Sequence, residues 1–303
     1  MHKHLFIIST LFIFSFTLQS THTYRNIQYG DYLVITYDNN DGELDWDNSG
    51  NNLAFVSSNN GKSEIFYLNL PKIPVKSAGN GFYSANYLSE LISKKNIYNL
   101  LFTSNDTSFY SPKWNKKGNK VMSIGKTENE SEIFITAKKK QELIGTKIKN
   151  VIAAHWKNDS TFYIVHQNHP KQLSEITLRD KQKKVIAETK FPIISISKQN
   201  NSILLTSKGG VSQFSIKNNS LEWFNLPVKE HAVWRLAKLN FVGLNQNGNA
   251  QILDLNNAIE YPFCYGDNNG PPAISSDKKF VAFYSEFFKG IIIKRIDKKF
   301  LME

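Results

Sequence analysis

The chain has 303 residues, a single cysteine and a formal net charge of +11 at pH 7. One cysteine excludes a framework of internal disulfide bonds, so a packed apolar core must supply the stability of the fold. The positive charge is typical of proteins that bind nucleic acid, but here the lysines lie in short runs such as residues 138–140 and 181–184. Lysines at strand edges and turns discourage edge-to-edge pairing, and we therefore predict no nucleic-acid partner.

The first 20 residues predict a secretory signal peptide. A basic start with Lys3 precedes an apolar run over residues 5–18, and Ser20 is a small residue suited to cleavage. This order is typical of exported proteins, and the run is shorter than the roughly 20 residues that a membrane-spanning helix needs. The region also lacks the cysteine of a lipid anchor. We expect a periplasmic or secreted, monomeric protein with no integral membrane segment after cleavage, in which residues 21–303 form one domain.

A repeat runs through the remainder of the chain. Its clearest copies surround two tryptophans, each followed by a polar turn that contains glycine and then by a β-branched and aromatic segment. The same position recurs six times, occupied by Trp46, Trp114, Trp156, Ile196, Trp234 and Ile274. Four of the five steps between these positions are about 40 residues, which is the length of one four-stranded propeller blade.

Each copy predicts four short strands. The first strand ends at the tryptophan position, and Gly50 or Gly118 supplies the positive φ that a tight turn requires. Segments such as 280–284 and 251–255 have the composition of the second and third strands. A period near 40 is too short for a stack of sandwich domains, which need about 100 residues each. The sequence therefore predicts an all-β, six-bladed β-propeller of four-stranded antiparallel blades.

Closure of the ring is predicted to use the N-terminal part of the chain. The sixth copy contains three predicted strands and runs out at Ile296, whereas residues 32–36 form a strand-like segment that belongs to no copy. Placing this segment as the fourth strand of the last blade closes the ring and removes the exposed edges.

The first step is longer than the others, and the surplus predicts an insertion at about residues 69–97. Residues 84–93 have helical spacing of apolar side chains. The insertion contains an aromatic and aliphatic stripe formed by Tyr83, Tyr87, Leu88, Leu91 and Ile92. An exposed stripe of this kind marks an interaction site, so we expect a partner-docking element; the alternative is that the stripe packs against the rim of the propeller itself.

The second copy carries a family resemblance. Its Pro112-x-Trp114 start, the Asn-Lys-Lys-Gly turn at residues 115–118 and the segment Glu132-Ile133-Phe134 resemble the repeats of TolB-like propellers, and the resemblance extends from about residue 44 to 296. It implies a six-bladed propeller that acts as a non-enzymatic binding platform for a protein or peptide within a cell-envelope assembly.

The sequence indicates no catalytic centre and no cofactor. It contains no G-x-S-x-G, P-loop, G-x-G-x-x-G or H-E-x-x-H motif. Cys264 follows an apolar strand-like segment, a context typical of an inert buried thiol. Residues 45–50 partly imitate a calcium loop, but Val56 stands where a bidentate glutamate is needed. We interpret them as the hairpin turn of the first blade.

His166 and His169 form the closest histidine pair after the signal region, in a turn of the third copy. Two histidines need a third ligand to hold a metal, and His155 and His231 are the other candidates near a channel. We interpret the pair as part of a solvated loop and predict no metal site. The alternative is a metal-assisted carbohydrate-active or hydrolytic enzyme that uses the channel mouth near this pair.

Six residues that precede the tryptophan position are predicted to border the central channel. They are Asp45, Lys113, His155, Ser195, Val233 and Ala273. Polar groups thus lie on one half of the ring and small or apolar groups on the other. Asp45, Lys113 and His155, together with His166 and His169 on the loop, are the candidate binding residues; the alternative is that the channel groups simply satisfy one another.

Overall fold

The computed structural model describes residues 32–34, 41–59, 61–69, 98–139, 142–226, 228–229, 233–237, 239–263, 269–286 and 290–302. The predicted signal peptide, residues 70–97 of the predicted insertion at about 69–97, His231 and Cys264 lie outside these ranges, so the expectations placed on them stay predictions. No helix within the described ranges is long and apolar enough to cross a membrane.

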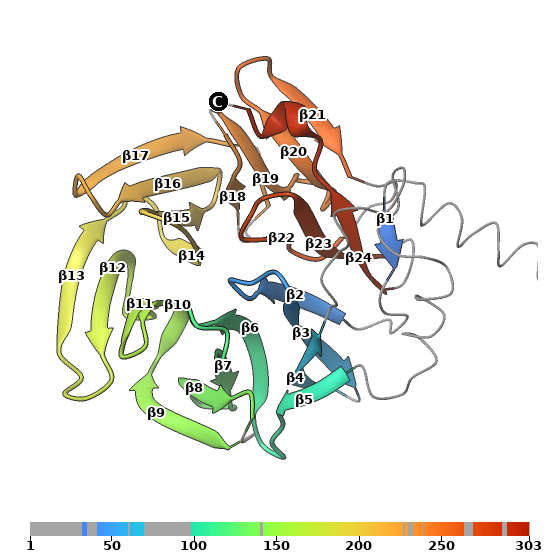
Figure 1. Ribbon diagram of the computed structural model, residues 1–303. Coiled ribbons are helices and arrows are strands. Elements are labelled where there is room, and N and C mark those ends of the chain that lie inside the picture. Colours follow the sequence, from blue (N-terminus) through green and yellow to red (C-terminus); the bar gives the residue numbers. More distant parts are fainter. Residues whose placement is uncertain are drawn as a thin grey trace, which may run out of the picture.

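The strands form six sheets of four antiparallel strands each, arranged in a ring (Figure 1). The innermost strands are β2 (Asp41–Trp46), β6 (Ser108–Trp114), β10 (Val151–Asn158), β14 (Ile193–Gln199), β18 (Trp234–Arg235) and β22 (Ala273–Ile274). The second strands are β3 (Asn52–Asn59), β7 (Lys120–Lys126), β11 (Thr161–His166), β15 (Ser202–Ser207), β19 (Asn240–Leu244) and β23 (Phe280–Ser285). The prediction of a six-bladed propeller is confirmed.

Two further strands complete each blade. The third strands are β4 (Lys62–Asn69), β8 (Ser131–Ala137), β12 (His169–Thr177), β16 (Gly210–Ser215), β20 (Ala250–Asp254) and β24 (Gly290–Arg295). The outer strands are β5 (Tyr98–Phe102), β9 (Leu143–Lys149), β13 (Lys183–Glu188), β17 (Ser220–Asn225), β21 (Ile259–Pro262) and β1 (Tyr32–Val34). A short 3₁₀ helix, η1 (Lys298–Phe300), follows the last blade.

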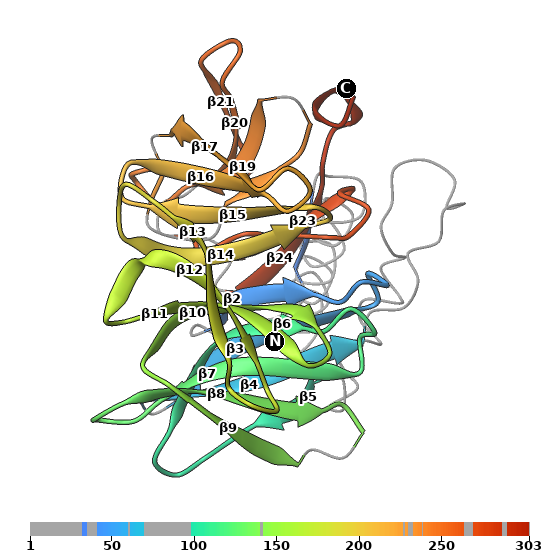
Figure 2. The ribbon, with the colours of Figure 1, turned by 90° about the vertical axis from the view of Figure 1, so that its left-hand side faces the viewer.

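Strand β1 closes the ring as predicted. It pairs antiparallel with β24, with Leu33 opposite Ile293, so the N-terminal strand becomes the outer strand of the blade that ends the chain. Figure 2 shows the ring from the side, with the strands running from one face to the other. The connections between strands therefore lie on two opposite faces, which surround the two ends of the central channel.

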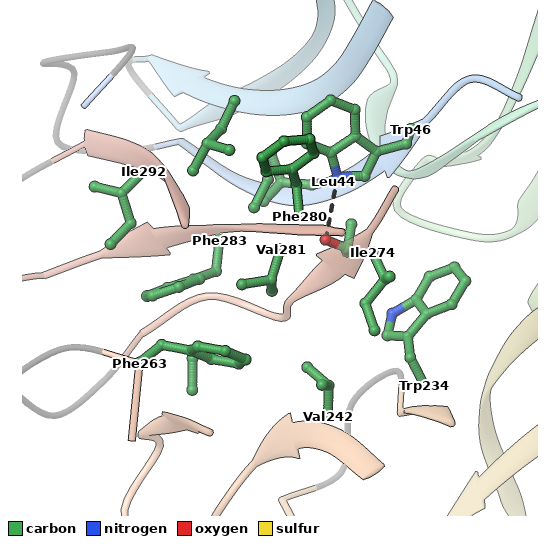
Figure 3. Packing of buried hydrophobic residues seen from close by; sticks show 14 of the residues in the cluster. Leu44, Trp46, Trp234, Val242, Phe263, Ile274, Phe280, Val281, Phe283 and Ile292 are labelled. Carbon is green, nitrogen blue, oxygen red and sulfur yellow. Dashed lines mark hydrogen bonds between the residues drawn. The ribbon is translucent and has the colours of Figure 1, made fainter. Parts of the chain in front are cut away.

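The tryptophan positions form the packing between neighbouring blades. All four tryptophans and their isoleucine counterparts are buried. The Trp46 indole donates a 3.1 Å hydrogen bond to the carbonyl of Ala273, and Trp234 donates one of 2.8 Å to Pro272. Figure 3 shows the Trp46 indole beside Phe280 and the Trp234 indole beside Ile274. The first and fifth blades thus share one apolar cluster with the sixth.

The turn between β2 and β3 uses its own acidic side chain. Asp47 accepts hydrogen bonds from the backbone N–H groups of Asn51 and Asn52 at 3.0 Å, and from the side chains of Ser49 and Asn52. In the turn of the second blade, the equivalent Asn115 accepts hydrogen bonds from the backbone N–H groups of Asn119 and Lys120. Residues 45–50 therefore belong to a hairpin, as interpreted from the sequence.

Candidate functional site

The inner strands of the first four blades share an irregularity near their beginnings. The register of β2, β6, β10 and β14 against the adjacent second strand shifts by one residue. The extra residue is Glu43 in β2, Ile152 in β10 and Ile194 in β14. In β6 it is Ser111 or Pro112. Glu43 and Ser111 have positive φ values of 29° and 54°. Such bulges re-aim side chains and are common at barrel rims and active sites.

The re-aimed residues line one cavity of about 700 Å³ at this end of the channel. We call it the first cavity. Residues 127–130, between β7 and β8, and Gln167, between β11 and β12, form its outer border. The first two blades contribute charged groups, among them Glu43 and Lys113. The third, fourth and sixth blades contribute an apolar wall that includes Ile152, Ile194 and Pro271.

Glu43 lies in a poorly solvated position at the base of the charged wall. Its carboxylate accepts a hydrogen bond from the backbone N–H of Ser111 in the next blade. Burial raises the pKa of Glu43, although that hydrogen bond and the charge of Lys113 oppose the rise. Burial and the charge of Glu43 also raise the pKa of the nearby Tyr110 to about 12. Tyr110 thus stays a neutral phenol beside a carboxylate.

Below the first cavity, Asp45 and Lys113 form a buried ion pair. Their charged atoms lie 3.6 Å apart, and each side chain is only 6% exposed. Asp45 also accepts a 2.8 Å hydrogen bond from the backbone N–H of Trp114. Burial raises the pKa of Asp45 to about 6 against the stabilising effect of Lys113. Lys113 lines the first cavity and Asp45 lines a second one, so the pair lies between them.

The second cavity, of about 600 Å³, lies among the hairpin turns on the opposite face. His155, Lys116 and Lys198 line it. Burial lowers the pKa of His155 to about 3, and the positive charges of Lys113 and Lys198 add to this effect. The His155 Nδ1 lies 3.1 Å from the carbonyl oxygen of Trp156, which can only accept, so Nδ1 carries the proton of the neutral ring.

The structure separates the residues that the sequence grouped together. Asp45 and Lys113 meet in the channel, and His155 is close enough for the charge of Lys113 to affect its pKa. His166 and His169 face each other across the β11–β12 turn, with ring centroids 6.4 Å apart, and line neither cavity. Within the described ranges, no three His, Cys, Asp or Glu side chains gather as metal ligands.

The three remaining channel positions also differ from one another. Ser195 lines the first cavity, whereas Val233 and Ala273 are fully buried within apolar clusters between blades. Val233 and Ala273 line neither cavity, in contrast to the polar residues at the other four positions.

Sequence reasoning missed the bulge residues of the first cavity. Glu43 and Ser111 both stand three positions before a repeat tryptophan, Trp46 and Trp114. Extending the repeat frame by two residues toward the N-terminus would have included them. Pro112 is a local signal of the bulge in β6, since a proline inside an inner strand is tolerated at a bulge. Glu43, Ile152 and Ile194 carry no such signal, because none of them is a proline or a glycine.

Comparison with known proteins gives a likeness in structure alone. No protein-family model matches the chain, and no curated protein matches it in sequence. An auxiliary nutrient binding protein from Bacteroides thetaiotaomicron is 8% identical over 86% of this chain and 75% of that one, with a TM-score of 0.54. An oligogalacturonate lyase from Vibrio parahaemolyticus is 13% identical over 88% of this chain and 92% of that one, with a TM-score of 0.51. TolB from Acinetobacter baumannii is 11% identical over 89% of this chain and 65% of that one, with a TM-score of 0.48. At these identities the first two likenesses show a shared β-propeller fold.

Proposed function

We propose that this protein is an exported, non-enzymatic binding module of the cell envelope, and that its first cavity holds an extended segment of a partner protein or peptide. The observation that carries the proposal is the row of bulged inner strands. Four neighbouring blades turn a side chain toward the same mouth. Side chains that point into a cavity can contact a ligand, whereas they contribute little to packing within a blade.

The apolar wall of the first cavity favours an aliphatic or aromatic side chain of the partner. Ile152, Ile194 and Pro271 are only partly buried within the protein, so a ligand could cover their remaining apolar surface. Covering such surface contributes about 25 cal/mol per Å². Binding sites for small ligands and side chains commonly combine such walls with a few polar groups.

The charged wall favours a basic group in the same segment. Lys113 lies near two carboxylates, those of Asp45 and Glu43, and forms an ion pair with Asp45. One ammonium group cannot neutralise two carboxylates, and Glu43 is the one that lines the first cavity. An ammonium or guanidinium group of the ligand would supply the missing charge in a poorly solvated place, where charge-assisted hydrogen bonds are strongest.

Selection from a displayed peptide library on the purified protein tests the proposal. We expect enriched peptides to contain a basic residue next to an apolar one. In direct binding assays, Glu43→Gln and Ile194→Lys should each weaken a selected peptide by about tenfold or more, equivalent to about 1.4 kcal/mol. Ile259→Lys is the matched control, because Ile259 is 45% exposed on the outer strand β21 and lines neither cavity.

Two results would contradict the proposal. Selected peptides that bind the Ile194→Lys and Ile259→Lys variants equally well would place binding elsewhere. Turnover of an added polysaccharide that depends on a divalent metal, and that is lost on replacing His166 and His169 by alanine, would instead support the metal-assisted enzyme.

A further inference from the structure

Two acidic side chains, those of Asp45 and Asp47, line the second cavity, and each already has partners within the protein. Asp45 is committed to Lys113 and to the N–H of Trp114. Asp47 is committed to its own turn, where it accepts bonds from Ser49 and from both nitrogens of Asn52. Asp45 is thus paired with Lys113, and the side chain of Asp47 is held within its own turn by neutral donors.

The lysines of this cavity fall into two classes. Lys157 forms a 2.6 Å ion pair with Glu175, and Lys278 donates a 2.5 Å hydrogen bond to the carbonyl of Leu236. Lys116 and Lys198 line the same cavity, and neither has an ion pair with any residue in the described ranges. Lys116 and Lys198 outnumber Asp47, the one carboxylate of this cavity without an ion pair among the described residues, so an excess of positive charge remains at this end of the channel.

Two neighbouring groups respond to that excess. Burial lowers the pKa of Lys198, and the charge of Lys116 lowers it further, so the two ammonium groups act on each other. The charge of Lys198 also contributes to the low pKa of His155. Both lysines line the same cavity, so their like charges repel each other. An anion between them would offset that repulsion.

We infer that the second cavity is a binding site for an oxyanion, a phosphate, sulfate or carboxylate group carried by a small molecule, held by Lys116 and Lys198. Lysine ammonium groups are compact point charges that suit such anions. Asn200 and Asn201 line the same cavity and can add neutral amide donors. Its volume of about 600 Å³ accommodates an organic anion rather than an inorganic ion alone. This site lies on the face opposite the proposed peptide site and does not depend on it.

Titration calorimetry at low ionic strength, in chloride buffer, tests the inference with inorganic phosphate, sulfate and citrate as separate probes. We expect saturable binding of at least one probe, and the ranking of phosphate against citrate distinguishes a phosphate-type from a carboxylate-type ligand. The double variant Lys116→Gln/Lys198→Gln should bind the preferred probe about tenfold more weakly or worse. It should melt no lower than the unmodified protein without the probe, because the substitution removes a repulsion.

The matched control is Lys208→Gln/Lys229→Gln, which removes the same net charge from two exposed lysines outside both cavities. We expect this variant and Glu43→Gln to bind the probe as the unmodified protein does, which separates this inference from the proposed function. Absence of saturable binding for all three probes would overturn the inference. Equal weakening in the two double variants would also overturn it, since the effect would then be one of overall charge.

Discussion

The repeat tryptophans occupy equivalent positions but make different hydrogen bonds. The Trp156 indole donates a 2.8 Å bond to the carbonyl of Lys113 in the neighbouring blade. The buried Trp114 indole nitrogen has no partner among the described residues, although its ring packs edge-on against Tyr67. Trp156 therefore combines packing with a polar link across a blade boundary, whereas Trp114 supplies packing.

This difference predicts unequal effects of phenylalanine. Trp156→Phe leaves the Lys113 carbonyl without its indole donor, so it should lower the free energy of unfolding by about 1 kcal/mol more than Trp114→Phe. Trp114→Ala, which empties the site, should cost about 3–5 kcal/mol. Denaturant titrations of the three variants measure these values. Equal losses for the two phenylalanine variants would show that the cross-blade hydrogen bond is not a net stabiliser.

Two channel residues predict opposite contributions to acid stability. The pKa of His155 falls from 6.5 to about 3 on folding, so its contribution is present above about pH 6.5 and is lost as the pH falls toward 3. The pKa of Asp45 rises from 3.8 to about 6, so its contribution is present below about pH 3.8 and is lost as the pH rises through 6.

We therefore expect His155→Gln and Asp45→Asn to change the pH dependence of the melting temperature in opposite directions. Between pH 7 and 4, His155→Gln should lose less stability on acidification than the unmodified protein, and Asp45→Asn should lose more. Curves parallel to that of the unmodified protein would contradict the assignment.

At the scale of elements, the hairpin turns between first and second strands provide a matched pair of glycines. Gly50 and Gly118 have φ values of +70° and +65°. A Cβ at residue 50 would meet no atom within 4 Å, whereas one at residue 118 would lie 3.0 Å from a carboxylate oxygen of Asp47 in the neighbouring blade. The second glycine thus serves both its own turn and the packing between blades.

Alanine at either position should be destabilising, with the larger loss at residue 118. The left-handed conformation alone costs about 1–2 kcal/mol for a residue with a Cβ, and Gly118→Ala should exceed Gly50→Ala because it also displaces Asp47. Thermal denaturation of the two single variants measures the difference. If Asp47→Ala abolished that difference, the contact between the turns would be confirmed as its cause.

The bulged inner strands show how far an element can be predicted. Alternating apolar residues and the turn at residues 47–50 indicate a strand that ends at Trp46, and β2 does so. The extra residue at Glu43 was not predicted. In a bulge, two residues of one strand lie opposite a single residue of the neighbouring strand. Whether one forms here depends on how the blades pack around the channel.

At the scale of the whole molecule, stability depends on the pairing of the two ends of the described chain. Strand β1 covers β24 through three paired residues. Without it, the backbone groups of β24 would be an exposed edge, which is a template for association with another chain.

Truncation tests this dependence. A chain that begins at residue 41 should unfold with a free energy lower by about 2 kcal/mol, for a few lost hydrogen bonds of about 1 kcal/mol each, and should self-associate as its concentration rises. A chain that begins at residue 26 keeps β1 and should behave as the longer chain does. Light scattering and denaturant titration follow the two effects. Equal stability of the two truncated chains would show that β1 is not needed for closure.

The sequence by itself determined the number of blades, the order of strands within each blade and the turn residues Asp47 and Asn115. These features depend on spacing, alternation and the conformational needs of glycine, all of which act over a few neighbouring residues. It also grouped Asp45, Lys113 and His155 as predicted channel residues, because they share one place in the repeat. Only the tertiary structure decided which of them interact. Asp45 and Lys113 come from neighbouring blades, and their separation of 3.6 Å follows from the packing of β2 against β6. The two cavities and the shifted pKa values of Glu43, Asp45 and His155 depend on desolvation, which is set by all the surrounding blades and by no local stretch of sequence.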